Sequence, residues 1–127
     1  LPHVARTSLR ENTPGLQILE MDTRAKDQST HTTKSVRVCF PYDRIVYKQT
    51  TLPALLNLHT GYWQLEVEGD GTLATAQHTV VINVEKIAGT WGDHVDVDEA
   101  RRRIRDTLGT NSRVTLSHAK DYAEQRH

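Results

Sequence analysis

The 127-residue sequence lacks features that mark several large classes of protein. Its single cysteine, Cys39, excludes an internal disulfide framework and suits a reducing compartment, so a cytoplasmic chain is expected. No apolar run approaches the roughly 20 residues that a membrane-spanning helix needs. Sixteen Lys and Arg balance 16 Asp and Glu, which argues against the basic excess of a nucleic-acid-binding protein. We therefore expect neither a membrane nor a nucleic acid as a partner.

Motifs of the common catalytic classes are missing as well. The sequence holds no GxSxG nucleophile motif, no glycine-rich phosphate loop and no HxH or HExxH metal motif. Three His-Thr pairs begin at His31, His59 and His78, and a zinc-dependent hydrolase would need these histidines to converge. No two of them share an element at ligand spacing, so no metal is expected.

What the sequence does hold is a richness in β-branched residues, with 16 Thr and 11 Val, which is typical of strands. Turn residues such as Pro14-Gly15 and Asp70-Gly71 divide the chain into strand candidates. Six strands are predicted, at residues 4–11, 16–24, 29–40, 44–52, 55–68 and 72–83, with a polar turn at 25–28. Connections this short make neighbouring strands antiparallel.

The pattern changes after residue 83. Residues 84–96 hold two glycines and a tryptophan and are interpreted as an irregular connection. Small and apolar residues then recur every three or four positions, which predicts one amphipathic helix over residues 97–125 with Asp98 as its N-cap. The predicted fold class is therefore α+β, with six antiparallel strands and one long C-terminal helix in a single domain over residues 1–127.

Alternation along the strands predicts which side chains face inward. Ala74, Ala76, His78, Val80 and Ile82 share the inward face of the last strand, and Trp63 faces inward on the strand before it. The small Ala74 and Ala76 leave room in which a tightly packed core would place larger groups.

The strand over residues 29–40 allows two interpretations. Its even positions Val36, Val38 and Phe40 are the apolar ones, and burying them would leave Arg37 in solvent. The other interpretation turns the hydroxyl-rich odd positions, together with Arg37, toward a cavity. The pattern alone favours the first, because burying an unpaired charge is costly.

The middle of the helix is polar on its inward stripe, at Thr107, Asn111, Ser112 and Thr115. Such a stripe suits a helix that lies over a cavity. It equally suits hydrogen bonds from these groups to neighbouring strands, and the sequence does not separate the two interpretations.

Three stretches carry a resemblance to a known family: residues 35–41 (SVRVCFP) with 43–49 behind them, residues 58–61 (LHTG) with Trp63, and residues 108–113 (LGTNSR). In their order and spacing they resemble the aromatase/cyclases of bacterial type II polyketide biosynthesis, most of all the second half of their two-domain members. These proteins have the START-like (SRPBCC) helix-grip fold, a curved antiparallel sheet around a long C-terminal helix. That fold begins with a strand and two short helices, so the resemblance implies that this chain is N-terminally incomplete.

The resemblance also implies an activity. These proteins bind a poly-β-ketone tethered through phosphopantetheine to an acyl carrier protein, and they direct its regiospecific aldol cyclisation and dehydration. The chemistry needs no cofactor, because the pocket selects one conformer, a strong donor stabilises the enolate and another group moves protons. Other synthase subunits, a second copy or a partner half-domain would be further partners. The alternative is a non-catalytic ligand-binding or structural half-domain of the same fold.

Site residues follow from the resemblance in the same way. Single-domain relatives carry a donor arginine near the end of the long strand, at the position of Cys39 here. Arg37 lies two residues earlier, on the same face, and is expected to take that catalytic role, which turns the odd face of the strand inward. His78 is the expected proton-transfer residue. The residues expected to bind substrate are Thr33, Ser35, Lys48, Trp63, Asn111 and Ser112.

Overall fold

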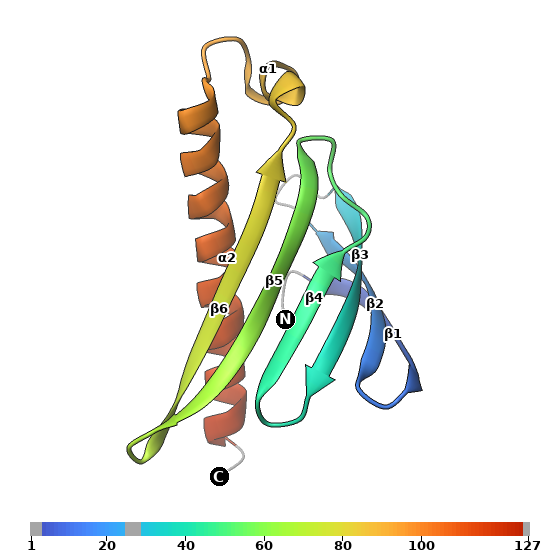
Figure 1. Cartoon of the computed structure of the whole chain (residues 1–127), viewed down its shortest axis with the longest axis vertical. Helices are drawn as coiled ribbons and strands as arrows, with labels where there is room; N and C mark the ends of the chain where they lie inside the picture. Colours follow the sequence, from blue (N-terminus) through green and yellow to red (C-terminus); the bar gives the residue numbers. More distant parts are fainter. Residues whose placement is uncertain (1–3, 25–28, 126–127) are drawn as a thin grey trace.

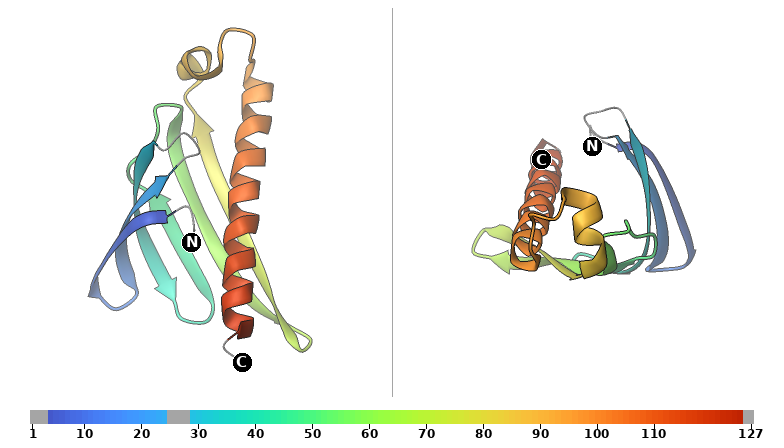
Figure 2. Two further views of the ribbon diagram at one scale, coloured as in Figure 1. Left: turned by 180° about the vertical axis from the view of Figure 1, so that it is seen from behind. Right: turned by 90° about the horizontal axis from the view of Figure 1, so that it is seen from above.

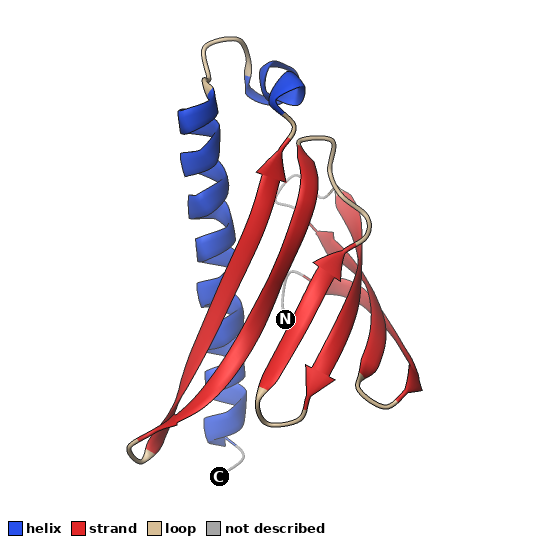
Figure 3. Ribbon diagram, in the orientation of Figure 1, coloured by secondary structure: helices blue, strands red, loops and turns tan. Residues whose placement is uncertain are grey.

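The computed structural model describes residues 4–24 and 29–125 of the chain. Six strands form one antiparallel sheet in which sequence neighbours are also spatial neighbours (Figures 1 and 3). The strands are β1 (Val4–Thr13), β2 (Leu16–Arg24), β3 (Thr30–Phe40), β4 (Arg44–Gln49), β5 (Leu56–Glu68) and β6 (Gly71–Ile82). The six-stranded antiparallel prediction is confirmed, and the turn predicted at 25–28 lies outside the described residues.

The segment after β6 is more regular than predicted. It contains a 3-10 helix, η1 (Val84–Lys86), and a short helix, α1 (Ile87–Trp91), before the long helix α2 (Val97–Gln125). Helical turns form here because they bury Ile87, which is only 4% exposed. The predicted cap of α2 was also wrong: the backbone N–H of Glu99 donates to Oδ1 of Asp96 at 2.8 Å. Asp96 caps the helix because it directly precedes the first helical residue.

The sheet curves around the side on which α2 lies, and α2 runs along β6 (Figure 2). A small apolar core joins the start of α2 to α1 and to the end of the sheet. Its buried members are Ile87, Val95 and Ala100, with Leu55, Ile82, Trp91 and Val97 packed against them. This core fixes the first turns of α2, so the rest of the helix is held along β6. None of the described helices is long and apolar enough to cross a lipid bilayer.

The faces of β3 are the reverse of what the pattern alone favours. Ser35 is buried and Arg37 is half-buried on the concave face, whereas Val36, Val38 and Phe40 are 37–46% exposed on the convex face. Arg37 can lie inward because it is only half-buried and its guanidinium is hydrogen-bonded: Nε and Nη2 both donate to Oε1 of Gln17 on β2. These hydrogen bonds reduce the burial cost on which the opposite interpretation rested.

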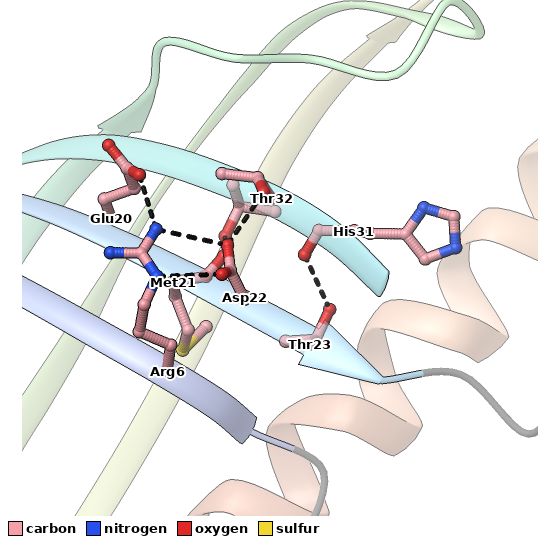
Figure 4. Close-up of polar contacts among 8 residues, drawn as sticks. Arg6, Glu20, Met21, Asp22, Thr23, His31 and Thr32 are labelled. Atoms are coloured by element: carbon pink, nitrogen blue, oxygen red, sulfur yellow. Dashed lines mark hydrogen bonds and ion pairs between the residues drawn. The ribbon is translucent and has the colours of Figure 1, made fainter. Parts of the chain in front are cut away.

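The convex face of β1–β3 carries an ion-pair network (Figure 4). Arg6 contacts both Glu20 and Asp22, and the hydroxyl of Thr32 donates to Asp22 at 2.7 Å. The guanidinium and this hydroxyl hold the pKa of Asp22 below its usual range, and the two carboxylates raise the pKa of Arg6. Exposed pairs of this kind contribute little to stability. The concave face, by contrast, carries the predicted site residues of the sheet other than Lys48.

Candidate functional site

One row of directly opposed residues crosses five strands of the sheet. Gln17 pairs with Arg37, Arg37 with Tyr47, Tyr47 with Gly61, and Gly61 with His78. Directly opposed residues of antiparallel strands share a face. The two predicted catalytic residues, Arg37 and His78, therefore lie in the same row on the concave face.

His78 is the centre of a hydrogen-bonded cluster drawn from four elements. Its Nε2 atom lies 2.6 Å from Oγ of Ser112 on α2. Its Nδ1 atom lies 2.9 Å from the hydroxyl of Tyr47 on β4 and 2.9 Å from Nε2 of His59 on β5. We call these four residues the His78 cluster. Ser112 is buried and bonds to a neighbouring strand, which is the second of the two interpretations of the polar helix stripe.

Gly61 makes the cluster sterically feasible. Tyr47 reaches β6 by crossing β5 at this position, and a Cβ atom on residue 61 would lie 2.5 Å from the tyrosine hydroxyl. The same Cβ would collide with the backbone carbonyl of Gln77, which cannot turn aside as a flexible side chain would. A glycine inside a strand often marks such a close approach.

Burial sets the protonation of the cluster. It raises the pKa of Tyr47 to about 12, so the phenol keeps its proton and can donate it in a hydrogen bond. Burial also lowers the pKa values of His59 and His78, and the neighbouring His78 charge lowers that of His59 further. Both imidazoles are therefore neutral near pH 7, and each carries one N–H donor and one acceptor nitrogen.

Arg37 is oriented by a chain of polar side chains from β1 and β2. Gln17 accepts from its Nε and Nη2 atoms at 3.2 and 2.5 Å, and the amide nitrogen of Gln17 donates to Glu11 at 2.7 Å. A guanidinium has five N–H donors. Within the described part of the chain, Gln17 is the partner of two of them, so the others can serve an anionic oxygen.

The other predicted site residues divide between two groups. Thr33, Ser35 and Trp63 lie on the concave face, where Thr33 donates to the carbonyl of Met21 at 3.4 Å and Trp63 is opposite Ala76. The expectation that Lys48 lines a cavity was wrong. It is exposed on the convex face, opposite Val36, because it follows the inward Tyr47 by one residue and side chains alternate along a strand.

Two hollows flank the helix. A groove of about 700 Å³ lies between β6 and α2, and its lining includes Ala76, His78, Ile104 and Leu108. A smaller hollow of about 290 Å³ is lined by Asp106, Thr107, Thr110 and Asn111 of α2. Ser112 thus lies with His78, whereas Asn111 is exposed beside the separate hollow.

The three-histidine interpretation does not fit the structure. His59 and His78 meet, but His31 lies at the start of β3, where its ring contacts Ser29. Its backbone carbonyl, visible in Figure 4, accepts from Thr23. Among the described residues, no three His, Cys, Asp or Glu side chains gather closely enough to hold a metal ion.

Sequence reasoning missed the roles of Tyr47, His59, Gly61 and Gln17. Gly61 carried a usable signal, because an isolated glycine inside a long strand pattern indicates close approach of another group. The contact of Tyr47 with His78 left no signal, because it depends on the register of three strands.

Comparison with protein-family models gave no match. Two similar proteins are each named granaticin polyketide synthase bifunctional cyclase/dehydratase. The one from Streptomyces virginiae is 49% identical over 117 residues (90% of this chain, 38% of the relative). The one from Streptomyces violaceoruber is 40% identical over 126 residues (98% and 39%). The actinorhodin polyketide synthase bifunctional cyclase/dehydratase of Streptomyces coelicolor is 41% identical over 129 residues (94% and 40%). The chain thus spans about two fifths of the length of the curated relatives it matches.

Solved structures of similar proteins have the same fold as this chain. The di-domain ARO/CYC BexL superposes with a TM-score of 0.90 at 61% identity, covering 95% of this chain and 39% of that one. The di-domain ARO/CYC StfQ gives 0.94 at 44% identity, covering 99% and 42%. The Zhui aromatase/cyclase gives 0.69 at 18% identity (91% and 71%), which supports the fold alone. The helix-grip prediction is confirmed.

The steric role of Gly61 can be tested by substitution. We expect Gly61→Ala to lower the free energy of unfolding by about 1–3 kcal/mol, because the added Cβ must displace Tyr47 and the β5–β6 backbone. Urea unfolding measures this. Gly89→Ala is the control, since a Cβ at Gly89 meets nothing within 4 Å. A Gly61→Ala chain as stable as wild type would contradict the steric role of Gly61.

The lowered pKa of His78 predicts a pH dependence of stability. Below about pH 6.5 the unfolded chain binds a proton that the folded chain does not, so the free energy of unfolding falls until the pH passes the folded-state pKa. We expect the free energy of unfolding to fall less between pH 7 and pH 5 in His78→Gln than in wild type. Urea unfolding near pH 7 and near pH 5 measures the difference. The exposed His118→Gln should keep the wild-type loss, and an unchanged loss in His78→Gln would refute the prediction.

Proposed function

Because this chain is a relative of the polyketide bifunctional cyclase/dehydratases over about two fifths of their length, we propose that it is part of an aromatase/cyclase. In this role it directs the regiospecific aldol cyclisation and dehydration of a poly-β-ketone in type II polyketide biosynthesis. The observation that carries the proposal is the shared row of Arg37 and the His78 cluster on the concave face. It supports a donor and a proton-transfer group facing one substrate.

The reaction assigns a separate task to each group. A base removes a proton from a methylene between two carbonyls, and the enolate carbon then attacks a carbonyl carbon further along the chain. The N–H groups of Arg37 that Gln17 does not engage stabilise the negative oxygen that develops. His78 takes up the methylene proton at Nε2 by way of the Ser112 hydroxyl, which lies 2.6 Å from that nitrogen, and later gives a proton to the hydroxyl that leaves as water.

The separation of the two groups favours a long substrate. Arg37 and His78 lie three strands apart in one row, which is about 14 Å between their Cα atoms at the usual strand spacing. A small ketone could not contact both residues. A poly-β-ketone, with a carbonyl on every second carbon, presents oxygens along this whole distance.

The carrier and the binding residues complete the proposal. The substrate arrives as a thioester of an acyl carrier protein, whose phosphopantetheine arm delivers it to the concave face. Thr33, Ser35, Trp63 and Ser112 provide hydroxyls and an aromatic surface there. The groove of about 700 Å³ between β6 and α2 meets this face at His78 and does not reach Arg37, and its volume is within the usual size of small-molecule sites, about 300–1,000 Å³.

Removing either group should change the products of a reconstituted minimal synthase supplied with this chain. We expect Arg37→Ala and His78→Ala to shift products toward spontaneously cyclised shunt compounds, with directed cyclisation slowed by about 10²-fold or more. Product analysis by chromatography and mass spectrometry measures the ratio, and circular dichroism checks folding.

Lys48→Ala is the matched control. The substitution removes a positive charge close to Arg37 in the same pair of strands, but the side chain of Lys48 lies on the convex face. Wild-type product ratios from both folded variants would favour the alternative, a non-catalytic binding or structural half-domain.

A further inference from the structure

The two ring nitrogens of His78 face different elements. Nε2 faces Ser112 on α2, whereas Nδ1 faces two groups of the sheet, the Tyr47 hydroxyl and Nε2 of His59, each at 2.9 Å. A ring nitrogen carries either one proton or one lone pair. Nδ1 therefore cannot use both partners in the same way at the same time.

Each partner fits one protonation form of the ring. When Nδ1 carries the proton, it can donate to Nε2 of His59, and the bare Nε2 of His78 then accepts from the Ser112 hydroxyl. When Nδ1 is bare, it can accept from the Tyr47 hydroxyl, and Nε2–H is then an acid facing Ser112. Both forms keep the two nitrogens of the His78 ring paired, and in each form one Nδ1 partner loses its bond to the ring: the Tyr47 hydroxyl in the first form and Nε2 of His59 in the second.

We infer that His59 and Tyr47 are positioning residues that act through His78 as a proton relay. As the substrate carbon gives its proton to the Ser112 oxygen, the Ser112 hydroxyl proton passes to Nε2 of His78, the Nδ1–H bond breaks and the Nδ1 proton moves to Nε2 of His59. Tyr47 then donates to the bare Nδ1.

The relay returns what it takes. For alkoxide protonation, or for the loss of hydroxide as water, His59 returns its proton to Nδ1 and the Nε2 proton passes to the substrate oxygen. Aldol addition and dehydration thus each take one proton from a substrate carbon and return one to a substrate oxygen, and no other reactant is needed. The use of the relay in catalysis rests on the proposed function, whereas its two hydrogen-bonded forms do not.

The groups around the relay do not favour one proton position of the imidazoles over another. Tyr47 faces His78 from β4 and His59 faces it from β5. From α2, Ser112 contacts the ring, and Arg101 and Arg105 line the groove that His78 also lines. In the described part of the chain, no carboxylate bonds to either imidazole.

The two partners predict opposite shifts in the tautomer of His78. In the ¹⁵N-histidine-labelled 127-residue chain without substrate, nitrogen shifts measured by NMR report which ring nitrogen carries the proton. Tyr47→Phe removes the donor and should raise the Nδ1–H population. His59→Phe removes the acceptor and should raise the Nε2–H population. His118→Phe, on the exposed face of α2, should leave His78 unchanged. Shifts in the same direction, or no shift, would overturn the relay.

A second variant tests proton transfer apart from packing. His59→Gln keeps a hydrogen-bonding side chain but cannot carry a proton, so kcat should fall about tenfold or more while KM is unchanged. A wild-type kcat in this variant would overturn the relay. If the chain has no cyclase activity at all, the proposed function fails, and the opposite tautomer shifts still establish the two forms.

Discussion

The hydrogen bond between Tyr47 and His78 is the contact on which the rest of the site depends, because it joins two strands that are not neighbours. It bridges β4 and β6 above β5, and it exists only because Gly61 has no side chain. The ring that it fixes places one nitrogen against α2 and the other against the sheet. The same register row carries Arg37, so this single crossing sets the relation between both groups of the proposed reaction.

Which side chains face each side of the sheet follows from the hydrogen-bond partners that buried polar groups find. On the concave face, Arg37 lies inward with Gln17 as its partner, and His78 lies inward with three partners. On the convex face, valines and a phenylalanine of β3 stay partly exposed, and the charges of β1 and β2 pair with each other. The half-buried polar groups of the concave face are thus hydrogen-bonded to one another. The apolar core is confined to the end of the sheet beside α1.

Much of this arrangement can be predicted from the sequence because it depends on local periodicity. Alternation places His78 and Trp63 inward, and the three-to-four-residue pattern identifies α2 and the inward Ser112. Periodicity could not orient β3, because the choice depends on whether Arg37 finds a partner, and Gln17 is 20 residues away. Lys48 was placed on the wrong face because the resemblance assigned it without considering that Tyr47, the preceding residue, faces inward. The meeting of Tyr47, His59 and His78 depends on the register of β4, β5 and β6, and alternation along a single strand does not give its register with the next strand.

The most direct test of the central claim is a product analysis of a minimal polyketide synthase with and without this chain. The account predicts that adding the chain converts a mixture of spontaneously cyclised shunt compounds into one predominant cyclised and dehydrated product. An identical product mixture in the presence and the absence of the folded chain would contradict it.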